Sequence, residues 1–296
     1  MGRIVVVGSV NADLVARAPR RPRGGETLTG WGFRMGPGGK GLNQAVAAKR
    51  AGGDVALVAA VGADHFGDIL RAAIVKEHID ARRVRVSLAP TGVAQITVTD
   101  DGENSIIVIP GANSDAHLTP EDEAMIDSAS HVMVQLERPI ELVRRTLERA
   151  RRGGVSTVVT PAPVVEDFTP LLGLCDVVVA NESEARALTG GRDVRESAVR
   201  LSAEERISII TRGASGCIIA VNGRIQHERS APVVTAVDST AAGDTFAGYL
   251  TAALAEGRDL ASAVATATDA AALSVTRPGA VSSIPTAAEV EAFALR

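Results

Sequence analysis

The chain has 296 residues, a formal net charge of −4 and 46% hydrophobic residues, which is ordinary usage for a globular protein. Only 2% of its residues are aromatic, so a nucleic-acid surface of basic and stacking side chains is not expected. Two cysteines, Cys175 and Cys217, cannot form a disulfide framework and are predicted to be buried thiols. The N-terminal apolar run is too short for a secretion signal, and no stretch is long enough for a membrane helix. We therefore expect a cytoplasmic protein.

Short apolar runs alternate with segments of helical spacing along most of the chain. The runs are typical of strands buried on both faces, and they lie at 3–8, 55–61, 131–136, 155–159, 176–180 and 207–211. Helices are predicted at 42–51, 66–77, 120–128, 139–152, 182–188, 193–203, 243–256, 259–276 and 286–295. This alternation predicts a mostly parallel sheet with helices on both faces. Length alone allows one large α/β domain or two smaller ones, and we expect a single domain spanning 1–296.

Two stretches interrupt the alternation. Residues 11–34 contain no clear helix, and residues 93–109 read as a hairpin around Asp101-Gly102. We expect the two stretches to pair as a small β-sheet, separate from the main one, that acts as a lid or as a dimer contact. A further hairpin is predicted at 216–228, around Asn222-Gly223.

The first candidate site follows the first strand. In open α/β sheets, ligands bind outside the carboxyl ends of the strands. Asn11 and Asp13 lie there, and their side chains can hydrogen-bond the hydroxyls of a polyol. An Asx turn would also explain these residue types.

A glycine-rich loop follows at residues 36–45. Gly36, Gly38 and Gly41 form Gly-x-Gly-x-x-Gly, the nucleotide-binding pattern of dehydrogenases, but the loop does not follow the first strand and no acid ends the next one. The P-loop pattern also fails, because Gly41 stands where Ser or Thr is required. We interpret the loop as one whose backbone, with Lys40 and Asn43, binds a polyol.

Asn181 and Glu184 begin a predicted helix and share one face of its first turn. They could hold a hydrated Mg²⁺, which needs only one or two protein oxygens, or they could simply cap the helix. The five histidines show no metal-ligand spacing.

The most specific motif is Val-Asp-Ser-Thr-Ala-Ala-Gly-Asp-Thr-Phe at 237–246. Residues Ala241, Ala242 and Gly243 carry almost no side-chain bulk, so their backbone amides can approach an anion closely at the start of a helix. Asp244 stands beside those amides. This arrangement predicts a site where charge on a transferring phosphoryl group is stabilised and a hydroxyl proton is accepted.

These motifs, in this order, resemble the ribokinase type of the PfkB carbohydrate-kinase family. The similarity runs from Gly8 to Pro285, and it rests on the Gly-Gly-Lys-Gly-x-Asn loop at 38–43 and on Asp238 to Phe246. It implies a three-layer ribokinase-like α/β fold with a small β-sheet lid, which would also form a homodimer contact. It further implies an ATP-dependent sugar kinase, with ribose as the expected sugar and with Mg²⁺ and K⁺ as activating ions.

The resemblance also assigns residue roles. The sugar would be bound by Asn11, Asp13, Gly39, Lys40, Asn43 and Glu137, with Asp244 as the general base and an anion hole at Ala241, Ala242 and Gly243. The ATP site would contain Asn181, Thr211, Gly213, Gly216, Ala242, Gly243 and Thr268, with Glu184 holding Mg²⁺ through water. The monovalent cation would be held by Asp238, Thr240, Ser274, Arg277, Gly279 and Ser283, several of them through backbone carbonyls.

Some positions depart from the family pattern, and other functions stay open. Thr160 stands where an Asn is common, and Thr268 with Asp269 replaces a common Asn or His near the adenine. Trp31 and Phe33 keep a nucleoside kinase possible, because a nucleoside would need a ring to stack on. Another sugar or sugar-acid kinase of the family, a nicotinamide dehydrogenase and a non-catalytic sugar sensor are the remaining alternatives.

Overall fold

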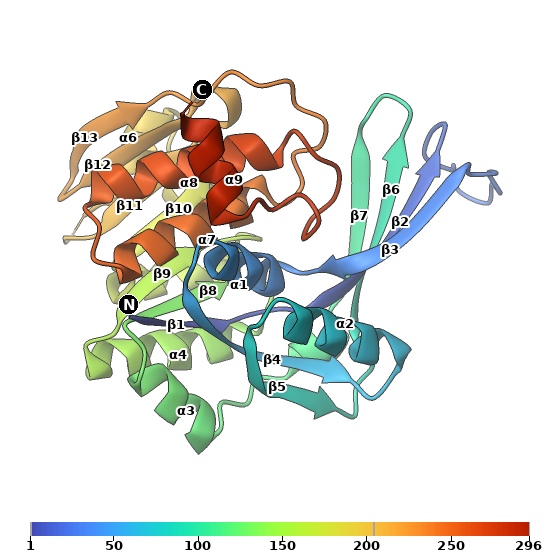
Figure 1. Cartoon of the computed structure of the whole chain (residues 1–296), viewed down its shortest axis with the longest axis horizontal. Helices are drawn as coiled ribbons and strands as arrows, with labels where there is room; N and C mark the ends of the chain where they lie inside the picture. The colour runs from blue at the N-terminus through green and yellow to red at the C-terminus, as the bar shows by residue number, and fades with distance from the viewer. Residues whose placement is uncertain (1, 204, 296) are drawn as a thin grey trace.

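The computed structural model describes residues 2–203 and 205–295, with a nine-stranded sheet at its centre (Figure 1). Its parallel strands are β1 (Arg3–Val7), β4 (Asp54–Gly62), β5 (Asp80–Ser87), β8 (His131–Gln135), β9 (Ser156–Thr160), β10 (Val177–Asn181) and β11 (Ile207–Thr211). An antiparallel hairpin, β12 (Cys217–Val221) and β13 (Arg224–Arg229), extends one edge. The strand order is β13-β12-β11-β10-β9-β8-β1-β4-β5.

Helices cover both faces of this sheet. One layer contains α1 (Lys40–Arg50), α2 (His65–Lys76), α7 (Ala242–Ala255), α8 (Leu260–Ser274) and α9 (Ala287–Ala294). The other contains α3 (Pro120–Asp127), α4 (Ile140–Gly153), α5 (Glu182–Thr189) and α6 (Val194–Leu201). Side chains of β1 alternate between the two cores: Ile4 and Val6 pack in one, Val5 and Val7 in the other. The predicted three-layer fold class is confirmed.

The order of the strands creates a crevice beside β1. From β1 the chain continues to β4 and β5 on one side, then crosses to β8 on the other side and proceeds to β9, β10 and β11. The carboxyl ends of β1 and β8 therefore lie at a topological switch point, where ligands bind in open α/β sheets. Residues 8–13 follow β1 at this point, and residues 136–138 follow β8.

A second sheet projects from the body, at the right of Figure 1. It consists of β3 (Gly32–Gly38), β2 (Asn11–Ala18), β6 (Gly92–Thr99) and β7 (Asn104–Ile109), in that order. β2, β6 and β7 come from the two stretches that interrupt the βα alternation, whereas β3 begins in the first stretch but extends beyond residue 34 into the predicted glycine-rich loop. β2 and β6 are parallel, whereas the other two pairings are antiparallel.

One strand of the central sheet was not predicted. β5 carries Arg82, Arg83 and Arg85, a composition that obscures a strand in the sequence. The structure explains these charges, because Arg83 and Arg85 form ion pairs with the buried carboxylate of Asp122 on α3. Among the described residues, every helix is too short or too polar to cross a bilayer.

The helices α1 and α7 pack unusually closely. A Cβ atom on Gly248 of α7 would lie 2.4 Å from the Cβ atom of Ala47 and 2.7 Å from the backbone nitrogen of Ala48. Small residues on both helices thus allow their backbones to approach, and α1 and α7 lie against each other beside the switch point.

We predict that Gly248→Ala destabilises the protein by about 1–3 kcal/mol, because its methyl group overlaps the backbone of α1. This loss should exceed the roughly 1 kcal/mol gained from helix propensity. Chemical denaturation measures the effect. Gly153→Ala in α4 is the matched control, because a Cβ atom there meets its nearest neighbour at 3.5 Å. Equal stabilities of the two variants would contradict the close packing.

Candidate active site

The carboxyl ends of β1 and β8 are joined through Glu137. Its Oε2 atom accepts hydrogen bonds from the Ser9 hydroxyl at 2.5 Å and from the Lys40 backbone N–H at 3.0 Å. Asn11 is buried, and its Oδ1 atom accepts from Asn113 Nδ2 at 2.8 Å. Polar side chains from both strand ends therefore converge at the switch point, held in fixed directions by their neighbours.

The glycines of the 36–41 loop are required by close contact. A Cβ atom on Gly38 would lie 2.1 Å from Asp13 Oδ2, and one on Gly41 would lie 2.5 Å from the Ser9 backbone nitrogen. Gly39 has a φ of 91°, in the left-handed region that favours glycine. The loop can thus lie directly on the residues after β1, which brings Lys40 and α1 to the crevice.

Asp13 is the most perturbed carboxyl of the crevice. Burial and the charges of Glu137 and Asp244 raise its pKa, Arg34 lowers it, and the result is a pKa of about 7. The carboxyl is therefore partly protonated near neutral pH in the free protein. A ligand that donates hydrogen bonds to it would favour the ionised form.

Lys40 lies among carboxylates. Asp244 raises its pKa most strongly, Glu137 and Glu184 add to this, and burial acts in the opposite direction. Its ammonium group stays protonated and supplies a positive charge between the two halves of the site. Lys40, Glu184 and Asp244 all line one pocket of about 200 Å³.

Asp244 stands in the first turn of α7, and its carboxylate is held by α1. Asn43 Nδ2 donates to its Oδ2 atom at 3.0 Å, and Gln44 Nε2 donates to its Oδ1 atom at 2.9 Å. Asn43 Oδ1 is buried and has no partner within the described residues. A buried acceptor without a partner is unusual, and a ligand hydroxyl that reached it would satisfy it.

The start of α7 offers backbone donors to the same pocket. Ala241 adopts a left-handed conformation, and the Ala242 N–H donates to the Ser239 carbonyl at 3.2 Å. In the described part of the chain, the N–H groups of Gly243 and Asp244 have no acceptor. The Ala241 N–H also has no acceptor among these residues, so within the expected Ala241–Gly243 set only the Ala242 N–H is engaged. Open space faces Gly243, so an anion can approach them.

Asn181 and Glu184 cap α5 and also line this pocket. Asn181 Oδ1 accepts from the Glu184 N–H at 2.9 Å, and the Asn181 N–H donates to Glu184 Oε2 at 2.8 Å. One carboxylate oxygen of Glu184 is left over, and burial raises the pKa of this group. Among the described residues, no cluster of three His, Cys, Asp or Glu could hold a metal. The donors fit an Mg²⁺ ion that keeps most of its waters.

The remaining residues expected at the ATP site are not all equally accessible. Thr211 lines the pocket beside Asn181. Gly213 and Gly216 lie in the β11–β12 turn, where a Cβ atom on Gly216 would lie 1.8 Å from the Arg229 carbonyl oxygen. Thr268 is only 5% exposed, and its hydroxyl donates to the Val264 carbonyl. Little of Thr268 is therefore accessible to a nucleotide.

Asp238 organises the loop before α7. Its Oδ1 atom accepts from the N–H and hydroxyl of Thr240, and its Oδ2 atom accepts from the Gly279 N–H at 2.8 Å. Burial tends to raise the pKa of Asp238, but these hydrogen bonds outweigh burial and lower the pKa. The hydroxyls of Ser274 and Ser283 donate to nearby carbonyls, and Arg277 pairs with Glu289. Of these three residues, Arg277 could contribute only its backbone carbonyl to a cation.

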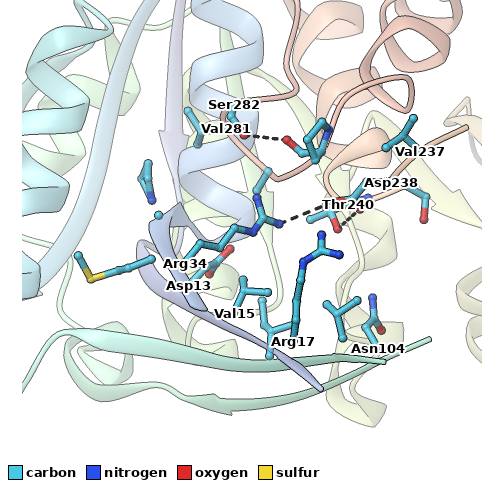
Figure 2. Close-up of a pocket in the computed structure, with 18 of the residues that line it drawn as sticks. Asp13, Val15, Arg17, Arg34, Asn104, Val237, Asp238, Thr240, Val281 and Ser282 are labelled. Atoms are coloured by element: carbon cyan, nitrogen blue, oxygen red, sulfur yellow. Dashed lines mark hydrogen bonds and ion pairs between the residues drawn. The ribbon is translucent and has the colours of Figure 1, made fainter. Parts of the chain in front are cut away.

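A cleft of about 1020 Å³ separates the small sheet from the body (Figure 2). Asp13, Val15 and Arg17 line it from β2, and Asp238 lines it from the opposite side. Arg34 extends from β3 into this cleft, with its guanidinium 3.8 Å from Asp238 Oδ2. The cleft leads from the Asp13 end of the site to solvent.

Comparison with known proteins agrees with this geometry. A profile described as pfkB family carbohydrate kinase matches residues 1–287. The chain belongs to the pfkB family of carbohydrate kinases. It is therefore a phosphotransferase whose acceptor is an alcohol group.

Individual relatives cover nearly the whole chain. The ribokinase of Haemophilus influenzae is 40% identical over 98% of this chain and 97% of its own length. Among solved structures, ribokinase from Thermotoga maritima has a TM-score of 0.92 at 33% identity, with both chains fully covered. Arabidopsis thaliana ribokinase, solved with ribose and ATP, has a TM-score of 0.90 at 27% identity, covering 99% of this chain and 98% of its own.

Sequence reasoning overlooked two residues of this pfkB site. Gln44 directly follows the glycine-rich motif on α1, yet it was not assigned a role, although it contacts Asp244. Thr160 was noted only as a departure, but it ends β9 and lines the pocket with Asp244 and Glu184. The sequence did offer a signal for both residues, because Gln44 lies at the start of a helix and Thr160 at the end of a strand, each beside a motif that had been recognised.

We predict that Asp13→Asn stabilises the free protein by roughly 2–4 kcal/mol at pH 8. The folded protein binds the Asp13 proton more tightly than the unfolded chain, so stability falls as pH rises from about 4 to 7. Replacing the carboxyl removes this loss. Urea unfolding at pH 5 and pH 8 measures it, and a stability difference that does not grow with pH would contradict the buried carboxyl.

Proposed function

We propose that this pfkB kinase transfers the γ-phosphate of ATP to the primary hydroxyl of D-ribose, giving ribose 5-phosphate and ADP. The observation that carries the proposal is the position of the Asp244 carboxylate, which lies between the polyol-binding groups of the crevice and the amides that begin α7. The ribokinase relatives, one of them solved with ribose and ATP, support ribose as the acceptor.

Sugar binding uses groups that the fold already orients. Asp13 and Glu137 accept hydrogen bonds from ring hydroxyls, while Asn11 and the free Oδ1 atom of Asn43 add directional contacts. Gly39 allows the loop to approach the sugar, and Lys40 partly offsets the surrounding negative charge. The primary hydroxyl then points toward Asp244.

Asp244 acts as the general base. Asn43 and Gln44 each use one lone pair of its carboxylate, so another lone pair remains to accept the hydroxyl proton. As the proton leaves, the hydroxyl oxygen bonds to the γ-phosphorus and the bond to the β–γ bridging oxygen breaks. The N–H groups at the start of α7 stabilise the charge on the transferring group.

Two ions are expected. Glu184 and Asn181 would hold Mg²⁺ through water, and the ion would neutralise phosphate charge when bound. Asp238 and Thr240, with carbonyls from Ser274, Arg277, Gly279 and Ser283, would hold K⁺ behind the anion pocket. This position supports an activating role, because the Asp238 loop leads directly into α7.

The small sheet serves as a lid and a dimer contact. One face carries Asp13, Val15 and Arg17 and lines the cleft, so its closure would exclude water from the sugar. The other face exposes the apolar side chains of Phe33, Met35, Ile107 and Ile109, of which Phe33 is 72% exposed. A second copy of this chain is the proposed partner of that face.

A nucleoside acceptor is the runner-up. Trp31 lines the cleft, but Arg17 lies over its ring at 5.4 Å and its Nε1 atom donates to Asp100. Phe33 is on the opposite face of the sheet. Turnover of ATP with ribose, deoxyribose, fructose, phosphosugars and nucleosides, with and without K⁺, separates these acceptors and the non-catalytic sensor. Ribose should be preferred and K⁺ should activate.

We predict that Asp244→Asn reduces kcat by at least about 100-fold, because the asparagine cannot accept the proton. Ribose and ATP binding, measured by calorimetry, should stay within a few-fold of the native chain. Turnover close to that of the native chain in this variant would disprove the role of Asp244.

We also predict that Gly243→Ala lowers kcat by about 10-fold or more without loss of stability. The added methyl group meets no protein atom within 4 Å, so it enters the open space where the transferring phosphoryl group would lie. Alanine is also the better helix former. Steady-state kinetics and thermal unfolding test both halves, and an unaffected kcat would place the phosphoryl group elsewhere.

A further inference from the structure

Behind the candidate base lies a buried pair of amides. Gln44 on α1 and Gln135 at the end of β8 are both fully buried. Gln135 Nε2 donates to Gln44 Oε1 at 2.7 Å. Gln44 Nε2 in turn donates to Asp244 Oδ1 at 2.9 Å and to Thr160 Oγ1 at 2.8 Å. Hydrogen bonds therefore run from the central sheet to both the base and a pocket hydroxyl.

Asp244, at one end, sets the donor-to-acceptor direction of these hydrogen bonds. An ionised carboxylate only accepts hydrogen bonds, so Gln44 must turn its NH₂ group toward Asp244. Its carbonyl then faces Gln135, which must present its own NH₂ group. Each amide thus has one orientation that satisfies the carboxylate.

This arrangement has a cost. Gln135 Oε1 is buried and has no partner within the described residues. An unsatisfied buried acceptor costs about 1–3 kcal/mol, which an apolar residue of similar size would avoid. Stability of the sheet therefore does not explain a glutamine at this position, whereas support for the site does.

We propose that Gln135 and Gln44 form a positioning relay that fixes the directions of the Asp244 carboxylate and the Thr160 hydroxyl. The proposal rests on the proposed role of Asp244 as the base. Gln44 and Asn43 together hold both carboxylate oxygens, so the carboxylate plane cannot rotate. Small errors in the placement of a reacting group cost up to about 100-fold in rate.

Thr160 extends the relay into the phosphoryl pocket. Because its oxygen accepts from Gln44, its own hydrogen must point to another acceptor. Thr160 lines the pocket with Asn181, Glu184 and Thr211, and a phosphoryl oxygen bound there is a suitable acceptor. The threonine that replaces a common asparagine thus keeps a donor at this position.

Gln135→Glu provides a sharp test, because the altered group does not contact Asp244. When protonated, the introduced carboxyl still donates to Gln44 Oε1 and preserves the relay. When ionised, it only accepts, so the Gln44 amide must flip and turn its carbonyl toward Asp244. Burial raises the pKa of the new carboxyl above its usual range. Two charged groups are linked to this position: Asp244 through Gln44, and Arg138, which hydrogen-bonds the carbonyl of Gly8 beside Gln135 Oε1.

We expect kcat of Gln135→Glu to lie within about 3-fold of the native chain at pH 6 and to be at least 10-fold lower at pH 8.5, with little change in the KM for ATP. Gln135→Met cannot ionise, so its kcat should fall by a similar factor, about 10-fold, at every pH. Circular dichroism at each pH gives the folded fraction by which kcat is normalised. Gln226→Glu, exposed on β13, is the matched control and should follow the native profile.

The relay would be overturned if folded Gln135→Glu had the same dependence of kcat on pH as the native chain. It would also be overturned if the loss of activity at each pH equalled the fraction of unfolded protein. If Gln135→Glu does not fold, native kcat in Gln135→Met overturns it equally. Asp244→Asn separates this result from the proposed function. If Asp244→Asn is active, the proposed role of Asp244 as the base is wrong. If Asp244→Asn is inactive but both Gln135 variants behave like the native chain, only the relay is refuted.

Discussion

The close contact between α1 and α7 is the constraint on which the site depends. Gly248 leaves room for Ala47 and Ala48, so two helices that are 200 residues apart in the chain approach backbone to backbone. That approach brings Asn43 and Gln44 within hydrogen-bond distance of Asp244. Bulkier residues between the two helices would separate the glycine-rich loop from the start of α7, although each helix could still form.

The site concentrates negative charge that folding by itself does not require. Asp244, Glu137 and Glu184 act on the ammonium group of Lys40, and Glu137 and Asp244 also act on the carboxyl of Asp13. Burial and mutual repulsion raise the pKa of Asp13, and burial raises that of Glu184. Substrates and ions that bring hydroxyl donors or positive charge would relieve this repulsion, so the free protein gives up stability for binding.

Strand order determines where these groups meet. β1 lies between β4 and β8, so the residues after β1 and β8 border the same crevice, while β2 and β3 carry the chain outward into the second sheet. Asp13 and Arg34 therefore belong to the projecting sheet, and Glu137 and Asp244 belong to the body. Movement of the projecting sheet would change the distances between these two groups without altering either one internally.

Sequence by itself determined the α/β class, most strands and helices, and the motifs at 38–43 and 238–246, because these features are local in spacing and residue type. The strand at 80–87 was missed because Arg83 and Arg85 find their buried partner, Asp122, on a helix about 40 residues further along the chain. Only the tertiary structure decided that Gln44 contacts Asp244, that the Ala242 N–H donates to the Ser239 carbonyl, and that Thr268 is buried. Such contacts join residues far apart in the chain, or depend on one backbone turn, and no local pattern encodes their distances.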